Sequence, residues 1–214
     1  MMRALVTGFE PFGGDRVNPS AEALARMPTR LGELSIATRI LPCVFGRALD
    51  VLGEAVAATE PDLVLGVGLA GGRAELSLER VAINIDDARI PDNDGNRPID
   101  RPVIGAGPPA YFSGLPIKAA VLALREAGLP AAVSNSAGTF VCNHVFYGLM
   151  HLAATGPRRF RGGFLHVPYL PDQAARQPGA PSMALADIVC GIGIILSVAA
   201  ARADDIVAAE GTLS

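Results

Sequence analysis

The sequence predicts an α/β/α sandwich: a single α/β domain over residues 1–214, with a mostly parallel twisted sheet that helices cover on both faces. Two observations predict this fold. Short apolar runs of strand length alternate along the chain with segments whose apolar residues recur at helical spacing, which is typical of a parallel sheet. One run, "DLVLGVG" at 62–68, is apolar enough to be buried on both faces, as central parallel strands are.

The first half of the chain begins with a strand and a capped helix. "ALVTGF" at 4–9 is apolar and of strand length. Asn18 followed by proline is typical of a helix start, here that of "AEALARM". A second strand is expected at 34–42. A helix is expected at 46–59, because leucine, valine and alanine recur there at helical spacing.

The second half continues the alternation. "RVAINI" at 80–85 alternates like a strand, and a long loop at 87–112 follows it. The remaining expected elements are, in chain order, a helix at 116–127, a strand near 131–135, a helix from Cys142, a strand at 162–170 and a closing helix at 182–202.

Composition and charge exclude several classes of protein. Half of the residues are hydrophobic and 18% are charged, so a large core can form. The net charge of -3 gives no electrostatic reason to expect nucleic acid or an anionic membrane as a partner. The longest uncharged apolar run, Ile188–Ala201, is shorter than the ~20 residues of a membrane-spanning helix. It indicates a helix in the core or at a subunit contact.

The three cysteines indicate a reducing compartment. Cys43, Cys142 and Cys190 are far apart and odd in number, and the sequence has no C-x-x-C pair. Neither a disulfide framework nor a metal site is therefore expected. The chain also starts without the long apolar core of a signal peptide, so we expect a cytoplasmic protein. Cys43 and Cys190 lie within apolar runs and are expected to be structural.

Four segments are expected to converge on one site. "GFEPFGG", "GVGLAGGR" and "HVPYLPD" each follow an expected strand directly, and "SAGTFVC" lies between a strand and a helix. Open α/β sheets bind ligands at the carboxyl ends of their strands, where such segments meet.

Cys142 is the candidate nucleophile. A thiol at a helix start faces unpaired N–H groups and the positive end of the helix dipole, which favour the thiolate. A nucleophilic cysteine also needs a base. Helical geometry turns His144 and His151 about 200° and 180° away from Cys142, which leaves His166. The residues alone leave two alternatives open: a Cys142–His166 pair and a buried structural thiol.

The glycine-rich segment offers a different function. "GVGLAGG" matches the dinucleotide-binding fingerprint at Gly66, Gly68 and Gly71. That fingerprint must open a long crossover helix, and the segment 72–79 is short and lacks helical apolar spacing. A non-catalytic or nucleotide-binding α/β module remains an alternative to an enzyme.

Several motifs resemble those of one known family. "TGFEPFGG" with "NPS", "GLAGGRAELSLERVAINIDDARIPDNDG", "SAGTFVCNHVFYGLM" and "FLHVPYLPDQ" occur in this order within residues 5–173. Together they resemble the pyroglutamyl-peptidase type I (pyrrolidone-carboxylate peptidase) family of cysteine peptidases. The resemblance implies removal of an N-terminal pyroglutamate from peptides, no cofactor, a single α/β/α domain and a homo-oligomer, often a tetramer.

The resemblance also implies a catalytic triad. The nucleophile of the family corresponds to Cys142, its histidine to His166 and its acid to Glu79 in "SLERVAIN". It further implies that Arg89 supports an oxyanion hole formed by backbone N–H groups around Cys142. From the residues alone, Glu79 would be a surface helix-cap carboxylate and Arg89 a solvated loop residue.

The substrate ring implied by the resemblance is an uncharged lactam, which needs flat apolar walls and a few amide partners. Phe9 and Phe12 match the aromatic residues that sandwich the ring in the family, with Phe140 and Val141 closing the pocket. Asn18 could pair with the ring amide, and its role as a helix cap is the alternative. From the residues alone, Phe9 and Phe12 would belong to the core.

Leu69 departs from the family pattern, which usually has glutamine at this position. Leucine cannot offer a side-chain amide to the lactam. Either backbone groups of this loop recognise the ring, or lactam affinity is weakened. A thiol enzyme that acts on a different small amide is therefore a further alternative.

Overall fold

The computed structural model describes residues 2–211, and these form a seven-stranded sheet in the order β2-β3-β1-β4-β9-β5-β8. The strands of this sheet are β1 (Met2–Phe9), β2 (Arg30–Leu31), β3 (Leu34–Leu41), β4 (Leu63–Leu69), β5 (Leu76–Glu79), β8 (Ala131–Ser134) and β9 (Arg161–Val167). A separate two-stranded sheet pairs β6 (Val81–Ile83) with β7 (Ala110–Phe112).

Most neighbouring strands run parallel. β3, β1, β4 and β9 are mutually parallel, and β8 is parallel to β5. β2 and β5 pair antiparallel with β3 and β9. The mostly parallel α/β sheet expected from the sequence is therefore confirmed.

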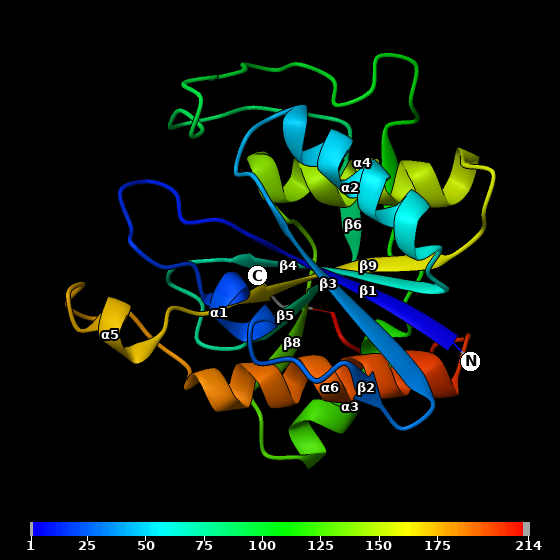
Figure 1. The fold of residues 1–214 in the computed structure, drawn as a ribbon. Helices are drawn as coiled ribbons and strands as arrows, with labels where there is room; N and C mark the ends of the chain where they lie inside the picture. The colour runs from blue at the N-terminus through cyan, green and yellow to red at the C-terminus, as the bar shows by residue number, and fades with distance from the viewer. Residues whose placement is uncertain (1, 212–214) are drawn as a thin grey trace.

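Helices cover both faces of the sheet (Figure 1). They are α1 (Pro19–Leu24), α2 (Arg47–Thr59), α3 (Ile117–Glu126), α4 (Val141–Thr155), α5 (Pro171–Ala174) and α6 (Leu185–Ala201). α2 and α4 pack on one face, and α1, α3 and α6 pack on the other, each with its own apolar cluster. Among the described residues, no helix is long and apolar enough to cross a membrane.

Strand β4 shows how the two faces differ. Leu63, Leu65 and Val67 point into the cluster under α1, α3 and α6. On the other face the strand carries Gly66 and Gly68, where an added Cβ would lie 2.5 Å from the Phe164 ring and 2.7 Å from the Cys142 sulfur. Glycine at these two positions therefore lets Phe164 and the start of α4 approach the strand closely.

The predicted elements differ from the structure mainly between residues 70 and 85. The strand expected at 80–85 is shorter in the structure, where β6 spans Val81–Ile83 in the small sheet. The strand β5, which ends at Glu79 within the main sheet, was not expected. β5 is four residues long and fully buried, so its pattern was too short to distinguish from a loop. The short helix α5 was not expected, and α6 begins at Leu185 rather than at 182.

Candidate active site

Several of the expected segments leave the same edge of the sheet. In Figure 1 the loops after β1 and β4, the segment after β9 and the start of α4 all lie on the left. β8 is different because it runs antiparallel to β9 through its pairing with β5. The segment 135–140 returns from β8 to this edge and leads into α4.

Cys142 is the second residue of α4, after the N-cap residue Phe140. The first N–H groups of a helix have no partner within it, so those beside Cys142 are available to a ligand. The sulfur lies over Gly68, and Gly68 is the register partner of His166 on β9. Paired residues of neighbouring strands point to the same face, which brings the thiol and the imidazole together.

His166 is held by Glu79. His166 Nδ1 lies 2.7 Å from Glu79 Oε1, and the two residues are 4% and 0% exposed. The antiparallel register of β5 and β9 pairs Ser77 with His166, so Glu79 lies diagonally across from the imidazole on the same face. An Nδ1–H that donates to the carboxylate leaves Nε2 as a proton acceptor. Glu79 is thus a buried strand residue, and the surface helix cap expected from the residues alone is wrong.

Arg73 completes this group, and sequence reasoning missed it. Its guanidinium donates from Nη1 to Glu79 Oε1 at 2.8 Å and from Nη2 to the Ser136 carbonyl at 3.2 Å. The only signal in the sequence is its position in "GLAGGR", six residues before Glu79. Had Glu79 been expected to be buried, a cationic partner would have been sought for it.

The environment of Cys142 opposes the formation of a thiolate. Burial raises the pKa of the Cys142 thiol well above its ordinary value, and electrostatic interactions with Cys43 and Glu79 raise it further, while Arg73 lowers it. Part of the residue is accessible, but protein surrounds the sulfur. The helix start alone favours the thiolate, so the direction expected from the sequence was the opposite one. The thiol therefore needs a proton acceptor before it can react.

The other two cysteines have different surroundings. Cys43 is 3% exposed, and burial raises the pKa of its thiol to about 12, which agrees with a structural role. Cys190 is exposed on the outer side of α6 and does not belong to the core. Helical periodicity turns it away from Ile188 and Ile192, which are buried.

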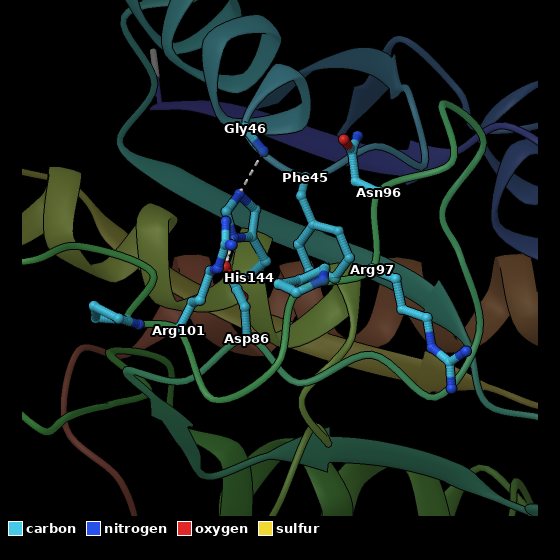
Figure 2. Close-up of a pocket in the computed structure, with 9 residues that line it drawn as sticks. Phe45, Gly46, Asp86, Asn96, Arg97, Arg101 and His144 are labelled. Carbon is cyan, nitrogen blue, oxygen red and sulfur yellow. Dashed lines mark hydrogen bonds and ion pairs between the residues drawn. The ribbon is translucent and has the colours of Figure 1, made fainter.

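The two remaining histidines are bound elsewhere. Figure 2 shows His144 between Gly46 and Asp86. His144 lines a pocket of about 410 Å³. His144 Nε2 accepts from the Gly46 N–H at 2.9 Å, and Nδ1 lies 2.8 Å from Asp86 Oδ2. His151 Nδ1 lies 2.9 Å from the Tyr111 hydroxyl. Both side chains point away from the Cys142–His166 region, as helical geometry predicted.

Aromatic rings line the chain around the start of α4. The rings of Phe12 and Phe140 are 6.0 Å apart, and Phe45 meets Phe140 edge-on at 5.4 Å. Phe12 and Phe140 are both half-buried, so each presents part of a flat apolar surface. Phe45 was not predicted from the sequence, because it lies in a turn before α2 and its spacing carries no signal.

Three predicted substrate-binding residues lie in the interior. Phe9 and Val141 are 2% and 0% exposed and belong to the cluster under α2 and α4, which favours the alternative core role for Phe9. The Asn18 side chain accepts from the Ser20 N–H at 3.1 Å and donates to the Glu10 carbonyl at 3.0 Å. Asn18 is thus the cap of α1. For these three side chains, direct contact with a substrate ring is not supported by the structure.

Leu69 is the last residue of β4, and the geometry of the strand fixes the directions of its side chain and of its backbone groups. Successive side chains alternate, so Leu69 points to the face opposite Gly68 and Cys142. Successive backbone groups alternate as well, and the Ala70 N–H donates to Val167 on β9 at 3.0 Å. The N–H and C=O of Leu69 therefore point to the β1 side, where pairing between β1 and β4 has ended at Thr7 and Gly66.

Arg89 lies in the exposed part of the loop between β6 and β7, which arches over α2 and α4 in Figure 1. Two residues before it, Asp87 is joined to Thr139: its N–H donates to the Thr139 carbonyl at 2.9 Å and its own carbonyl accepts from the Thr139 hydroxyl at 2.8 Å. These bonds attach the loop near Arg89 to the segment that leads into α4.

The alternative of dinucleotide binding lacks its structural context. Residues 70–75 form a turn between β4 and β5, and the crossover helix that the fingerprint requires does not follow β4. Residues 2–211 also contain no group of three histidine, cysteine or acidic side chains that could hold a metal ion.

Comparisons with known proteins show the family to which the chain belongs. A family model described as pyroglutamyl peptidase matches residues 2–202. The chain is 56% identical over 212 residues to a pyrrolidone-carboxylate peptidase of Erwinia tasmaniensis, with 99% of each chain covered. It is 54% identical over 200 residues to one of Yersinia pestis, with 93% of each covered.

Solved structures give the same result. A crystal structure of pyroglutamyl peptidase I from Bacillus amyloliquefaciens is 48% identical, with a TM-score of 0.93, and 96% of this chain and 100% of that chain are covered. A mutant pyrrolidone carboxyl peptidase from P. furiosus is 41% identical, with a TM-score of 0.91. The match covers 94% of this chain and 99% of that chain.

Proposed function

The chain belongs to the pyroglutamyl peptidase family, and we propose that it hydrolyses the amide bond after an N-terminal pyroglutamate with Cys142, His166 and Glu79 as its triad. One observation carries the assignment of residues. The 2.7 Å bond between His166 and the buried Glu79 orients the imidazole on the face where the Cys142 sulfur lies. This is the order of nucleophile, base and orienting acid that thiol peptidases require.

The chemistry begins with a proton transfer. His166 Nε2 takes the proton of the Cys142 thiol, and the sulfur attacks the carbonyl carbon of the pyroglutamyl residue. A C–S bond forms, and the carbonyl electron pair moves to oxygen. His166 then gives its proton to the leaving amine as the C–N bond breaks. Water attacks the resulting thioester, again with His166 as base, and 5-oxoproline is released as the C–S bond breaks.

The negative charge that develops on the carbonyl oxygen of the substrate needs hydrogen-bond donors. The free N–H groups at the start of α4 lie beside the sulfur, and the N-terminal end of a helix favours negative charge. Arg89 is proposed as a further donor, because the bonds between Asp87 and Thr139 hold its loop near this helix start. Glu79 stabilises the imidazolium that forms when His166 accepts a proton.

We assign recognition of the lactam to rings and backbone. Phe12 and Phe140 offer partly exposed apolar faces, and Phe45 packs edge-on against Phe140. The N–H and C=O of Leu69 are a donor and an acceptor that point to the same side of one residue, which suits the C=O and N–H of a lactam. Of the two alternatives for Leu69, this favours backbone recognition over weakened affinity.

This assignment predicts that Leu69→Gln leaves KM for a pyroglutamyl substrate nearly unchanged. A side-chain hydrogen bond to the ring would be worth on the order of 1 kcal/mol, or about fivefold in KM. We expect a change below about twofold, because the side chain points to the opposite face of the strand. Steady-state kinetics of both proteins measure this. A fivefold fall in KM would mean that residue 69 meets the ring through its side chain.

The proposed activity is tested with a panel of fluorogenic amides. We expect turnover of the pyroglutamyl amide, little turnover of prolyl and other aminoacyl amides, and loss of activity with iodoacetamide. Turnover of another small amide would favour a different thiol amidase. No turnover of any amide would favour a non-catalytic or nucleotide-binding module.

We also propose that the chain forms a homo-oligomer, a tetramer by its resemblance to the family, in the cytoplasm. An apolar groove of about 430 Å³ runs along the outer side of α6, lined by Val189, Ile194 and Val198 with Met27 and Leu31. A second copy of the chain would cover these side chains. A reducing compartment suits an enzyme whose cysteines are free and whose nucleophile is a thiol.

Ile194→Glu is accordingly expected to lower the molar mass of the assembly, because it introduces a charge into a buried apolar contact. Size-exclusion chromatography with light scattering measures this, with Val207→Glu as the control, since Val207 is fully exposed and lies outside α6. Equal masses for the wild type and Ile194→Glu would show that subunits do not meet through this groove.

A further inference from the structure

Arg73 contacts the triad but has no part in the chemistry described above. It lies in the turn between β4 and β5, and its side chain is 31% exposed, whereas that of Glu79 is 0% exposed. The guanidinium thus reaches from the surface to a carboxylate in the interior. Its second bond, to the Ser136 carbonyl, holds it against the segment that leads into α4.

The two donors to Glu79 converge on one oxygen. Oε1 accepts from both His166 and Arg73, at 2.7 and 2.8 Å. Oε2 is buried and has no hydrogen-bond partner among residues 2–211. The charge of the carboxylate is therefore compensated only through Oε1. Before proton transfer the imidazole is neutral, and Arg73 is then the only cation bonded to this carboxylate within the described residues.

We infer that Arg73 is a positioning residue that keeps Glu79 ionised and bonded to His166 during the part of the cycle when the imidazole is neutral. The inference rests on the proposed function, since it concerns the same triad. A buried carboxylate without a cation is strongly disfavoured and takes up a proton instead. A protonated Glu79 could not stabilise the imidazolium that forms when Cys142 loses its proton.

The charges around Glu79 support this direction. The ionisable groups that face it are His166 on β9, Cys142 on α4 and Arg73 itself. The carboxylate raises the pKa of Cys142 and the guanidinium lowers it. Arg73 therefore offsets the cost that Glu79 imposes on thiolate formation. Glu79 can still orient His166 and stabilise its imidazolium.

The inference is tested with a double-mutant cycle on pyroglutamyl amide hydrolysis. Arg73→Gln is expected to lower kcat by about 10- to 100-fold, as loss of a charged hydrogen bond does, with KM little changed. In a Glu79→Gln background the same substitution should have almost no further effect, because Arg73 then has no charge to hold. Arg73→Lys should recover part of the loss, since it retains the cation. Arg26→Gln is the matched control, an exposed arginine paired with Glu22 on the surface.

The pH profile separates this role from a purely structural one. Without Arg73 no cation faces the buried Glu79 carboxylate before proton transfer, so kcat/KM should begin to fall at a higher pH in Arg73→Gln than in the wild type and partly return in Arg73→Lys. Thermal unfolding of each variant checks that the protein is folded. A loss that is equal in both backgrounds, or a raised KM with unchanged kcat, would overturn the inference and point to direct contact with substrate.

The cycle also distinguishes failure of the inference from failure of the triad. If Glu79→Gln alone keeps full turnover, the proposed triad is wrong, and the role of Arg73 falls with it. If Glu79→Gln costs activity but Arg73→Gln does not, the triad stands and only the inference is overturned.

Discussion

Replacing Cys142 by serine is expected to lower turnover of pyroglutamyl amides by about four orders of magnitude or more while leaving the fold intact. A hydroxyl is far less acidic than a thiol, and burial already disfavours the anion at this position. Serine is smaller than cysteine, so the close approach of α4 to Gly68 is preserved. Steady-state kinetics and circular dichroism together measure both parts of the result.

The other cysteines are the controls for this substitution. Cys190→Ser changes an exposed residue on α6 and should leave both activity and stability unchanged. Cys43→Ser puts a hydroxyl into the core, so it should lower stability but retain turnover in the folded fraction. Near-wild-type turnover of Cys142→Ser would show that the nucleophile lies elsewhere.

Local geometry in the sequence led to Cys142 and His166 as a candidate pair, with a buried structural thiol as the alternative. The position of Cys142 at a helix start follows from the pattern of the helix, and the rotation per residue removes His144 and His151 from consideration. Both steps depend only on residues close in sequence. The pairing of β4 with β9, which brings His166 beside Gly68, is a long-range contact that helix and strand patterns do not specify.

The burial of Glu79 could not be predicted from local sequence patterns. β5 is four residues long and inserts between β9 and β8, so the burial of Glu79 depends on the order of strands in the sheet. The residues themselves favoured a surface carboxylate, and only resemblance to a family indicated a catalytic acid. Arg73 was missed for the same reason, since a buried carboxylate is what makes a cationic partner necessary.

Burial also explains why the predicted pocket residues and the predicted direction of the Cys142 pKa differ from those in the structure. Phe9 and Val141 are aromatic and apolar residues next to a functional segment, and no local pattern separates a pocket wall from the core behind it. The expectation that Cys142 favours the thiolate took account of the helix dipole but not of desolvation. Desolvation depends on how closely β4, β9 and α4 pack.

His166→Ala is expected to reduce turnover by orders of magnitude, because it removes both the acceptor for the thiol proton and the donor to the leaving amine. His144→Ala and His151→Ala should affect mainly stability. His144 joins Gly46 to Asp86, and His151 is bonded to Tyr111, so each substitution leaves a buried or partly buried partner without its bond.

Alkylation of Cys142 by iodoacetamide at pH 6 measures the same role without substrate. The raised pKa of the thiol means that, without a base, its reactive form is gained only as the pH rises far above neutral. The alkylation rate at pH 6 should therefore fall in His166→Ala, and in Glu79→Gln to a smaller extent, and should recover in both at alkaline pH. Cys43 is buried and Cys190 is not at the site, so the Cys190→Ser background isolates the signal. If His144→Ala or His151→Ala abolished turnover in a folded protein while His166→Ala retained it, the base would have to be assigned to another histidine.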